Sequence, residues 1–307
     1  MTTKRDFLTL RDLSIDEHLA VFRRAKELKA ARRARQLVTT MAGRTLVMIF
    51  EKASTRTRLS FEAAMVQMGG SCIDLSASTS QMARGEPLPD TARVVGRYCD
   101  VVMMRTFGDE RIRELAKHCE VPVINGLTDG GHPVQILTDL LTIEERLGRL
   151  KGTTIAFVGD TGSNMGRSFT EGASLFGYTL KLASPPGYHP ADDVVRLSKD
   201  QVQLLSDPRA AVEGADAVVT DVWTSMGQEA ESKKRLVDLG AYQVDATLMK
   251  LAAPHAVFLH CLPAHRGEEV TGDVIDGPQS AVWDEAENRL HLQKALLEFV
   301  VLGARSA

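Results

Sequence analysis

The residues best suited to chemistry in this 307-residue chain form a short polar stretch, S-T-R-T-R at 54–58. An apolar run at 45–50 precedes it and predicts a buried strand, and apolar residues at helical spacing follow it at 59–68. We therefore expect a strand-to-helix turn, whose helix start leaves about four backbone N–H groups unpaired and carries a partial positive charge. Side-chain hydroxyls and a guanidinium would complete a cradle for a dianionic phosphate. The residues that would form it are the N-cap Ser54, Thr55, Arg56 and Thr57.

The same pattern also fits an ordinary N-capped helix with solvated arginines, and spacing alone favours neither interpretation. Basic residues in the first turn of a helix oppose the helix dipole. The presence of both Arg56 and Arg58 there is a reason to expect an anion.

Charged side chains also follow two further predicted strands. Arg105 comes after an apolar run at 101–104, and Asp221 comes after one at 217–219. A residue at the carboxyl end of a parallel strand points into the crevice where α/β proteins bind ligands. Arg105 could thus serve a ligand, and Asp221 could hold a substrate cation. A surface salt bridge for Arg105 and a capping role for Asp221 fit the spacing equally well.

His132 precedes Pro133, which suits the first position of a helix predicted at 133–147. That helix is expected to join two domains, and small-molecule sites often lie at such junctions. Gln135, about one turn further on, would face the same way. A lone histidine is more often structural, so its position alone assigns it no role.

His260 and Cys261 leave a strand predicted at 255–259, and together they suggest a thiol nucleophile with its base. Adjacent residues of a strand point to opposite faces, so these two are not expected to act on each other. A plain core cysteine is the simpler interpretation.

A glycine-rich turn follows the strand predicted at 153–160. Its glycines at 159, 162 and 166 do not fit the G-x-G-x-x-G pattern of dinucleotide sites, and no acidic residue closes a strand about 20 residues further on. A nicotinamide cofactor is therefore not expected.

Strands and helices alternate along the chain, which predicts an α/β fold with two domains. Each domain should hold a mostly parallel sheet with helices on both faces, with helices linking the domains and the C-terminal helix packing back on the first. We assign 1–131 with the C-terminal helix 285–307 to the first domain, and 132–284 with the linker helix 133–147 to the second. The other predicted elements are strands at 71–75, 121–125, 178–183 and 203–205, helices at 15–31, 109–118 and from the cap Asp90 to Tyr98, and an exposed polar loop at 76–89.

The composition narrows the class of protein. A net charge of −3 and a pI near 6.3 give no reason to expect nucleic acid as a partner. No apolar run is long enough to span a membrane, and the first residues lack the apolar core of a signal peptide. The four cysteines form no C-x-x-C pair, which is typical of reduced thiols in a cytosolic protein.

Taken together and in order, four motifs resemble the carbamoyltransferases. They are S-T-R-T-R at 54–58, R-T at 105–106, H-P-x-Q at 132–135 and H-C-L-P at 260–263. The aspartate enzymes resemble the first half of the chain but do not carry D-x-W-x-S-M-G, which stands here at 221–227 and is similar to the ornithine carbamoyltransferase family. The resemblance covers nearly the whole chain.

This resemblance implies transfer of the carbamoyl group of carbamoyl phosphate to the δ-amine of L-ornithine, which gives L-citrulline and phosphate in arginine metabolism. It implies no metal and no organic cofactor. The first domain would bind carbamoyl phosphate and the second ornithine. Cytoplasmic homotrimers, or multiples of trimers, with active sites shared between subunits are also implied.

Position by position, the resemblance implies three groups of site residues. The phosphate would be held by Ser54, Thr55, Arg56, Thr57, Arg105 and, from a neighbouring subunit, Gln81. The carbamoyl group would be bound by Thr57, Arg105 and His132 at its oxygen, and by Gln135, Arg289 and the carbonyls near Cys261 and Leu262 at its nitrogen. The amino-acid end of ornithine would be held by Asn164, Asp221, Ser225 and Met226. Cys261 would bind without becoming a covalent nucleophile, and Ser163 stands where the family often has an asparagine.

Two alternatives stay open. The acceptor could instead be aspartate, putrescine or an acylated ornithine, or the chain could be a non-catalytic anion-binding protein that uses the same helix start. Asp221 with S-M-G at 225–227 favours unmodified ornithine. Gln135 and Arg289, found together with the phosphate residues, favour an enzyme.

Overall fold

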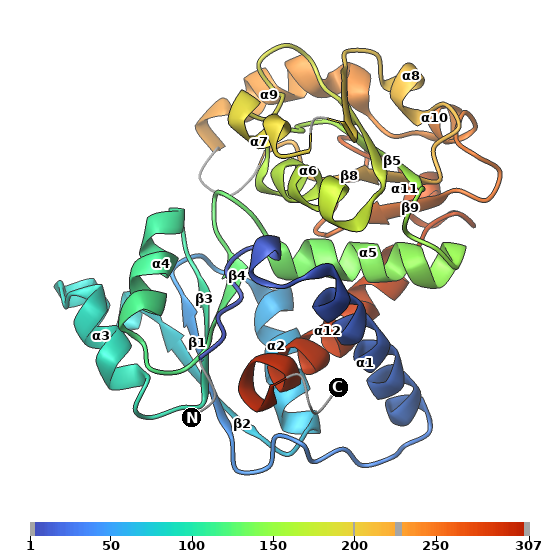
Figure 1. The fold of residues 1–307 in the computed structure, drawn as a ribbon. Coiled ribbons are helices and arrows are strands. Elements are labelled where there is room, and N and C mark those ends of the chain that lie inside the picture. Colours follow the sequence, from blue (N-terminus) through green and yellow to red (C-terminus); the bar gives the residue numbers. More distant parts are fainter. Residues whose placement is uncertain (1–3, 199, 225–228, 304–307) are drawn as a thin grey trace. The chain divides into compact units, whose positions relative to one another are not determined.

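The computed structural model describes residues 4–198, 200–224 and 229–303 (Figure 1). The chain divides into two compact units. The first comprises Met1–Leu137 and Glu287–Ala307, and the second comprises Thr138–Ala286. Each unit contains its own parallel sheet, as the alternation of strands and helices predicts.

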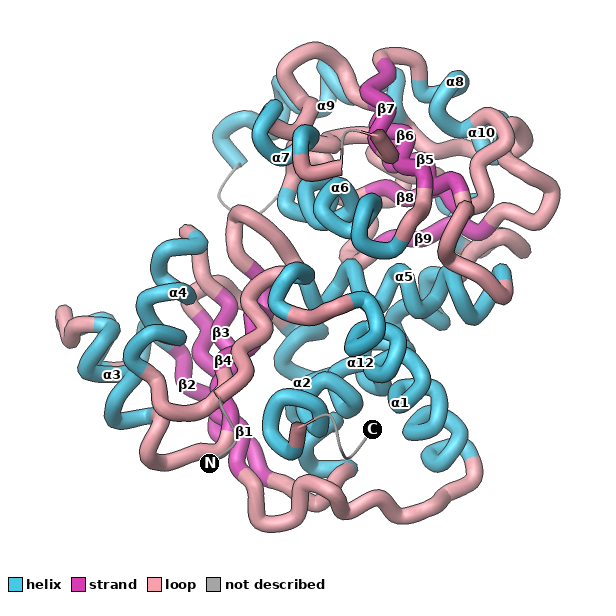
Figure 2. Tube along the Cα trace, in the orientation of Figure 1, coloured by secondary structure: helices cyan, strands magenta, loops and turns pink. Residues whose placement is uncertain are grey.

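The sheet of the first unit has the strand order β2-β1-β3-β4, with every neighbouring pair parallel. Side chains that alternate along its strands face opposite layers of helices. Val47, Ile49, Val102 and Met104 pack with α3 and α4 in one apolar cluster. Helix α2 lies on the other face (Figure 2). The strands are β1 Thr45–Phe50, β2 Ser71–Ser76, β3 Val101–Arg105 and β4 Val123–Leu127. The helices are α1 Ile15–Arg33, α2 Thr55–Gln67, α3 Leu88–Val95 and α4 Asp109–His118, with short 3₁₀ turns at Leu10–Asp12, Ala77–Thr79 (η2) and Gln81–Arg84 (η3).

The C-terminal helix α12, Val282–Leu302, packs against α1, as expected from the sequence. Lys29 Nζ donates to Asn288 Oδ1 at 2.7 Å, and Arg24 forms a 2.6 Å ion pair with Glu298. These contacts hold residues more than 250 positions apart in one unit, and they bring the end of the chain back to its first helix.

The sheet of the second unit has the order β7-β6-β5-β8-β9, again with every neighbouring pair parallel. One face packs on α8, α10 and α11 through a cluster that includes Val158, Val218 and Phe258. On the other face Phe157 meets Phe169 of α6, with ring centroids 5.7 Å apart. The strands are β5 Thr154–Val158, β6 Thr179–Ala183, β7 Val202–Leu205, β8 Ala217–Thr220 and β9 Val257–His260. Helix α5 Pro133–Leu147 begins in the first unit and continues in the second, which starts at Thr138. The other helices are α6 Asn164–Phe176, α7 Asp192–Arg196, α8 Pro208–Val212, α9 Ser232–Leu239, α10 Ala246–Met249 and α11 Gly272–Ile275, with 3₁₀ turns at Glu229–Glu231 and Gly240–Tyr242.

The predicted fold class is confirmed, with local differences. The segment at 76–89 is not wholly a loop, because η2 and η3 lie in it. Helix α3 begins at Leu88 with Pro87 at its N-cap, so Asp90 lies inside the first turn and is not the cap. Proline fixes the backbone angle that a helix start needs, and two prolines so close together set the start earlier than the aspartate suggested. Among the described residues, no helix is long and apolar enough to cross a membrane.

In both sheets the next strands in the sequence are added on one side of the first strand, and the later strands are added on its other side. This places a topological switch point between β1 and β3 in the first unit and between β5 and β8 in the second. Ligands of open α/β sheets bind outside the carboxyl ends of strands at such points. The segments that leave these four strands are therefore the places to look for a site.

Candidate active site

The turn after β1 has the geometry of an anion-binding helix start. Ser54 is the N-cap of α2, with φ −160°, and its side chain accepts from the backbone N–H of Thr57 at 3.4 Å. The first turn of α2 contains no acidic residue. Arg58 forms a 3.1 Å ion pair with Asp74 of β2, whereas Arg56 is exposed and no carboxylate of the described residues pairs with it. Only one of the two arginines is thus neutralised within the unit.

Arg105 lies beside this turn because of the strand register. It ends β3 directly opposite Phe50, the last residue of β1. Its backbone carbonyl accepts from the N–H of Glu51 at 2.9 Å, which fixes the first residue of the turn. The register shift between β3 and β4 at Met104/Arg105 occurs at the same point. The side chain is buried, with 8% of its surface exposed.

Thr57, Gln135 and Arg289 form one buried cluster in the first unit. Arg289 Nη2 donates to Thr57 Oγ1 at 2.8 Å, and its Nη1 donates to Gln135 Oε1. All three side chains are at least 95% buried. Gln135 lies on the first turns of α5 and Arg289 on α12, so two elements far apart in the sequence bring polar groups to Thr57 at the start of α2.

His132 shares this environment. Its side chain is buried, and its pKa is lowered well below the ordinary value, first by burial and then by the positive charges of Arg289 and Arg105. The imidazole is therefore neutral near pH 7, with one N–H donor and one acceptor nitrogen. A ligand here would meet two buried guanidinium groups and a neutral histidine, which suits an anionic group with a polarisable carbonyl.

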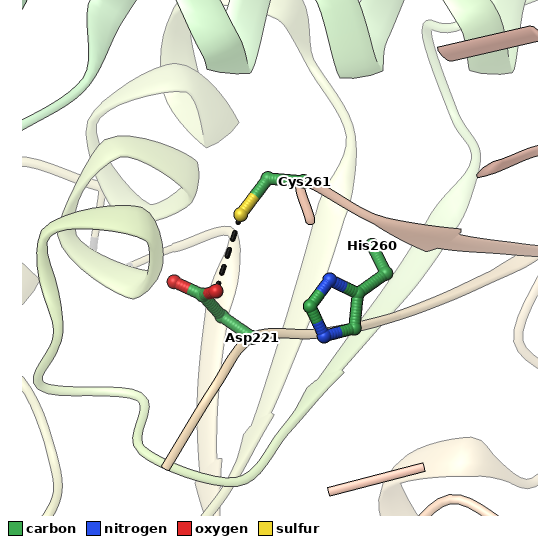
Figure 3. A group of neighbouring side chains, drawn as sticks. All are labelled: Asp221, His260 and Cys261. Carbon is green, nitrogen blue, oxygen red and sulfur yellow. Dashed lines mark hydrogen bonds between the residues drawn. The ribbon is translucent and has the colours of Figure 1, made fainter. Parts of the chain in front are cut away.

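In the second unit, Asp221 and Cys261 contact each other (Figure 3). The residues before them, Thr220 and His260, are paired in the register of β8 and β9. Cys261 Sγ donates to Asp221 Oδ1 at 3.1 Å. Burial raises the pKa of the Cys261 thiol well above its usual value, and the charge of Asp221 raises it further. The thiol is thus held protonated, which does not suit a nucleophile.

The ring of His260 is engaged elsewhere. Its Nε2 lies 3.0 Å from Glu269 Oε1, and its Nδ1 accepts from the backbone N–H of Leu262 at 2.9 Å. The structure therefore agrees that His260 and Cys261 are not base and nucleophile for each other. Ligand atoms of Asp221, His260 and Cys261 lie within 4.8 Å of one another, but the ring could bind a metal ion only by giving up one of these hydrogen bonds.

Leu262 has an uncommon backbone. Its φ is 59°, in the left-handed region that non-glycine residues seldom adopt, and the peptide bond to Pro263 is cis. A left-handed backbone at a non-glycine residue persists where the surrounding structure fixes it, and such residues cluster at ligand sites. The hydrogen bond from Leu262 N–H to His260 is one such constraint, and it fixes the backbone that follows Cys261.

The remaining predicted residues are placed as follows. Asn164 is the first residue of α6 and is partly exposed. Ser163 is the N-cap of α6 and accepts from the N–H of Gly166 at 3.3 Å, so it has a structural role where a family asparagine often stands. Gln81 begins η3 and is exposed, and in the described structure its side chain makes no hydrogen bond to the α2 turn. Ser225 and Met226 lie outside the described residues.

Sequence reasoning missed two residues at the second switch point. Asp160 follows β5 and forms a buried 2.6 Å ion pair with Arg235 of α9. The rule that selected Asp221, a carboxylate just beyond a strand end, applies equally to Asp160. Arg235 had no such signal, because it lies within helix α9 and does not follow a predicted strand.

The two sheets define an α/β protein with two groups of polar side chains, which we call half-sites: a cationic one in the first unit, around the start of α2 and Arg105, and one in the second unit that presents the carboxylate of Asp221. The sequence matches the description "Aspartate/ornithine carbamoyltransferase, carbamoyl-P binding domain" over residues 5–145. It matches "Aspartate/ornithine carbamoyltransferase, Asp/Orn binding domain" over residues 151–300. The chain belongs to the aspartate/ornithine carbamoyltransferase family.

Similar proteins carry the ornithine name. The ornithine carbamoyltransferase of Halorhodospira halophila is 54% identical, over 97% of this chain and 99% of its own. The anabolic ornithine carbamoyltransferase of Pseudomonas aeruginosa is 49% identical, over 99% of each chain. The solved structure of the Pyrococcus furiosus ornithine carbamoyltransferase aligns with a TM-score of 0.94 at 45% identity, over 98% of each chain.

Proposed function

We propose that this chain is an ornithine carbamoyltransferase, which transfers the carbamoyl group of carbamoyl phosphate to the δ-amine of L-ornithine and releases L-citrulline and phosphate. Family membership and the full-length relatives of that name support it. One observation of the structure carries it furthest: the buried contact of Arg289 with Thr57 and Gln135, beside a neutral His132 and Arg105. Residues 1–131 with 285–307 would form the carbamoyl phosphate-binding domain, and 132–284 the ornithine-binding domain.

The phosphate of carbamoyl phosphate would bind at the start of α2. The unpaired N–H groups of the first turn and the exposed guanidinium of Arg56 are suited to a dianion. Ser54, Thr55 and Thr57 would add hydroxyls, and Arg105 would add a second guanidinium from the end of β3. Charge-assisted hydrogen bonds of this kind are roughly twice as strong as neutral ones.

The carbamoyl oxygen would accept from Thr57, Arg105 and His132. Negative charge develops on this oxygen when the amine attacks, and one fixed donor at such a position is typically worth about 2.7–4 kcal/mol. A neutral His132 can donate one N–H without being a cation. The carbamoyl nitrogen would be oriented by Gln135, Arg289 and the carbonyls of Cys261 and Leu262.

Asp221 would pair with the α-ammonium of ornithine, with Asn164, Ser225 and Met226 holding the rest of its amino-acid end. The δ-amine attacks only when neutral, and its ammonium form has a pKa of about 10.4 in water. Burial and nearby positive charge both favour the neutral amine. Cys261 would stay a protonated thiol that donates to Asp221, and no covalent intermediate forms on it.

A homotrimer, or a multiple of trimers, would complete the enzyme. The edge strand β2 and helix α2 carry apolar side chains that the chain alone leaves exposed: Leu59 by 60%, Val66 by 58% and Ile73 by 49%. An exposed edge strand is commonly covered by another element or chain. Exposed Gln81 on η3, which follows β2, would reach the phosphate of the neighbouring subunit.

The chain would act in arginine biosynthesis, like its anabolic relative, and in the cytoplasm. Cys72, Cys99, Cys119 and Cys261 are all free thiols, which suits a reducing compartment.

An acceptor panel tests the proposal. Purified protein with carbamoyl phosphate is offered ornithine, aspartate, putrescine and N-acetylornithine, and citrulline and phosphate are measured. We expect equal amounts of citrulline and phosphate with ornithine, without added metal, and little product with the others. Product only from another acceptor would replace ornithine, and phosphate binding by calorimetry without any turnover would favour the non-catalytic alternative.

A further inference from the structure

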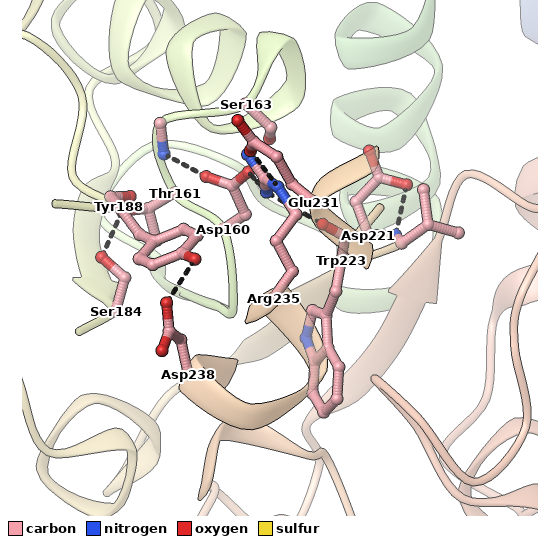
Figure 4. Close-up of polar contacts among 12 residues, drawn as sticks. Asp160, Thr161, Ser163, Ser184, Tyr188, Asp221, Trp223, Glu231, Arg235 and Asp238 are labelled. Carbon is pink, nitrogen blue, oxygen red and sulfur yellow. Dashed lines mark hydrogen bonds and ion pairs between the residues drawn. The ribbon is translucent and has the colours of Figure 1, made fainter. Parts of the chain in front are cut away.

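The second unit contains a buried ionic network that the proposed chemistry does not use (Figure 4). At its centre Arg235 Nη1 donates to Asp160 Oδ2 at 2.6 Å and to the backbone carbonyl of Trp223 at 2.9 Å. Both side chains of the ion pair are about 90% buried. Arg235 also contacts Glu231 at 3.3 Å, and its guanidinium lies 5.3 Å from the ring centroid of Tyr188. Burying two charges is costly unless geometry and hydrogen bonds compensate, so such a network needs an explanation.

The network joins the two segments that leave the second switch point. Asp160 follows β5 and also accepts from Gly162 N–H at 3.2 Å, in the turn that leads to Asn164. The carbonyl of Trp223 lies two residues beyond Asp221, which follows β8. Strands β5 and β8 are parallel neighbours. One guanidinium therefore binds both the turn before Asn164 and the segment after Asp221.

The side chain of Trp223 packs in the same place. It is 97% buried, and a Cβ added to Gly159 would lie only 3.2 Å from its Nε1. Gly159 has φ +120°, which favours glycine. The indole and the glycine backbone thus fit closely, and Arg235 holds the carbonyl of the same tryptophan. This packing lies two residues beyond Asp221, just after the end of β8.

The network also separates the roles of two carboxylates. Burial raises the pKa of the Asp160 carboxyl, Arg235 opposes that rise, and the charge of nearby Asp221 adds to it. Asp160 is neutralised by its ion pair with Arg235, whereas Asp221 accepts hydrogen bonds from the thiol of Cys261 and the N–H of Val222 and forms no ion pair with any described residue. A substrate ammonium would then meet a single uncompensated carboxylate.

We infer that the Asp160–Arg235 ion pair is the positioning element of the ornithine half-site, holding the Asn164 turn and the Asp221 segment in one arrangement. This inference rests on the proposed function. Arg235 and Asp160 are positioning residues, because they act through Asn164 and Asp221 and are not assigned a contact with substrate. Removal of the pair is therefore expected to weaken ornithine binding and to spare carbamoyl phosphate, whose proposed residues lie mostly in the first unit.

The test compares Arg235→Met with Arg266→Met. Arg266 is an exposed control in the same unit, matched in its partners, because it also contacts one aspartate, Asp276 at 2.5 Å, and one backbone carbonyl, that of Gly272 at 3.3 Å. We expect Arg235→Met to raise the KM for ornithine by about ten- to hundredfold, since small misplacements of binding groups have effects of that size. The KM for carbamoyl phosphate should stay within about twofold, and Arg266→Met should change neither constant. An ornithine KM within about twofold of wild type in folded Arg235→Met would overturn the inference.

Two further variants distinguish a loss of positioning from the effect of an unpaired buried charge and from a failure to fold. Asp160→Asn combined with Arg235→Met removes the buried charge left behind, so a stray carboxylate can no longer explain a defect. Positioning predicts that the double variant still binds ornithine weakly, and a restored KM would contradict it. If Arg235→Met does not fold, Arg235→Lys decides: it keeps the charge but not the two-pronged donor, so a raised ornithine KM supports positioning and an unchanged one refutes it.

Failure of the proposed function would look different. Wild-type protein would then make no citrulline from ornithine, whatever the variants do. The inference alone fails when wild type is active and Arg235→Met shows the same ornithine KM.

Discussion

The two units solve opposite electrostatic problems with the same architecture. Each has a parallel sheet whose chain changes direction beside its first strand, and each places polar side chains where the strands on either side of that point end. In the first unit these side chains are Arg56, at the helix start after β1, and Arg105, at the end of β3. In the second they are Asp160 after β5, which is already paired with Arg235, and Asp221 after β8, which accepts a hydrogen bond from the thiol of Cys261. The fold thus fixes where these side chains lie, and the few residues after each strand determine the charge that each unit presents there.

The largest effect is expected from a substitution at the start of α2, where the first unit is proposed to bind the phosphate. Arg56→Ala should weaken carbamoyl phosphate binding by about 10- to 100-fold, because a hydrogen bond between charged groups is worth about 1.5–3 kcal/mol. Arg58→Ala is the control, since this guanidinium already pairs with Asp74 and is more than half exposed. Calorimetric titration with inorganic phosphate measures both. Equal losses in the two variants would mean that overall charge, and not the site, attracts the anion.

The corresponding experiment in the second unit changes Asp221, which is proposed to bind ornithine. Asp221→Asn keeps the shape of the side chain and removes the charge proposed to bind the α-ammonium. We expect the KM for ornithine to rise by about tenfold or more, with the KM for carbamoyl phosphate unchanged. Steady-state kinetics against each substrate in turn provide the readout. A larger change in the KM for carbamoyl phosphate than in the KM for ornithine would show that Asp221 does not belong to the ornithine half-site.

Much of this could be predicted from the sequence, because the signals are local. Apolar runs gave β1 and β3, and helix α5 begins at Pro133 and ends at Leu147 as predicted. The predicted start of α3 was wrong, because the helix begins at Leu88 with Pro87 as its N-cap and not at a cap formed by Asp90.

The contacts of the site could not be predicted in the same way. Arg289 meets Thr57 across 232 positions of sequence, and Arg235 meets Asp160 across 75. No periodicity or spacing relates such residues, because their contact depends on strand order and helix packing. Arg289 was predicted from the resemblance to a family. Arg235 was predicted neither from that resemblance nor from local sequence patterns.

The smallest predicted effect concerns pH and distinguishes the first unit. The pKa of His132 is lowered in the folded protein by burial and by Arg289 and Arg105. The unfolded chain therefore takes up a proton as the pH falls through about 6.5, where the folded protein does not. This contribution to stability is complete above that pH and is lost as the pH falls toward the folded pKa. His132→Gln should thus lose less free energy of unfolding than wild type between pH 8 and pH 5.

Urea unfolding at both pH values, at one protein concentration, measures that difference. Each pKa unit between the unfolded and folded states is worth about 1.4 kcal/mol. The other titrating groups are common to both proteins, so only the difference between their pH dependences matters. Identical dependence in the two proteins would mean that His132 titrates normally in the folded state.

The most direct test of the opposite signs of the two half-sites is a crystal soaked with carbamoyl phosphate alone. Its phosphate is expected within hydrogen-bonding distance of the first-turn N–H groups of α2 and of Arg56 and Arg105, with no phosphate beside Asp221. A phosphate bound in the second unit, with the start of α2 left empty, would contradict the account.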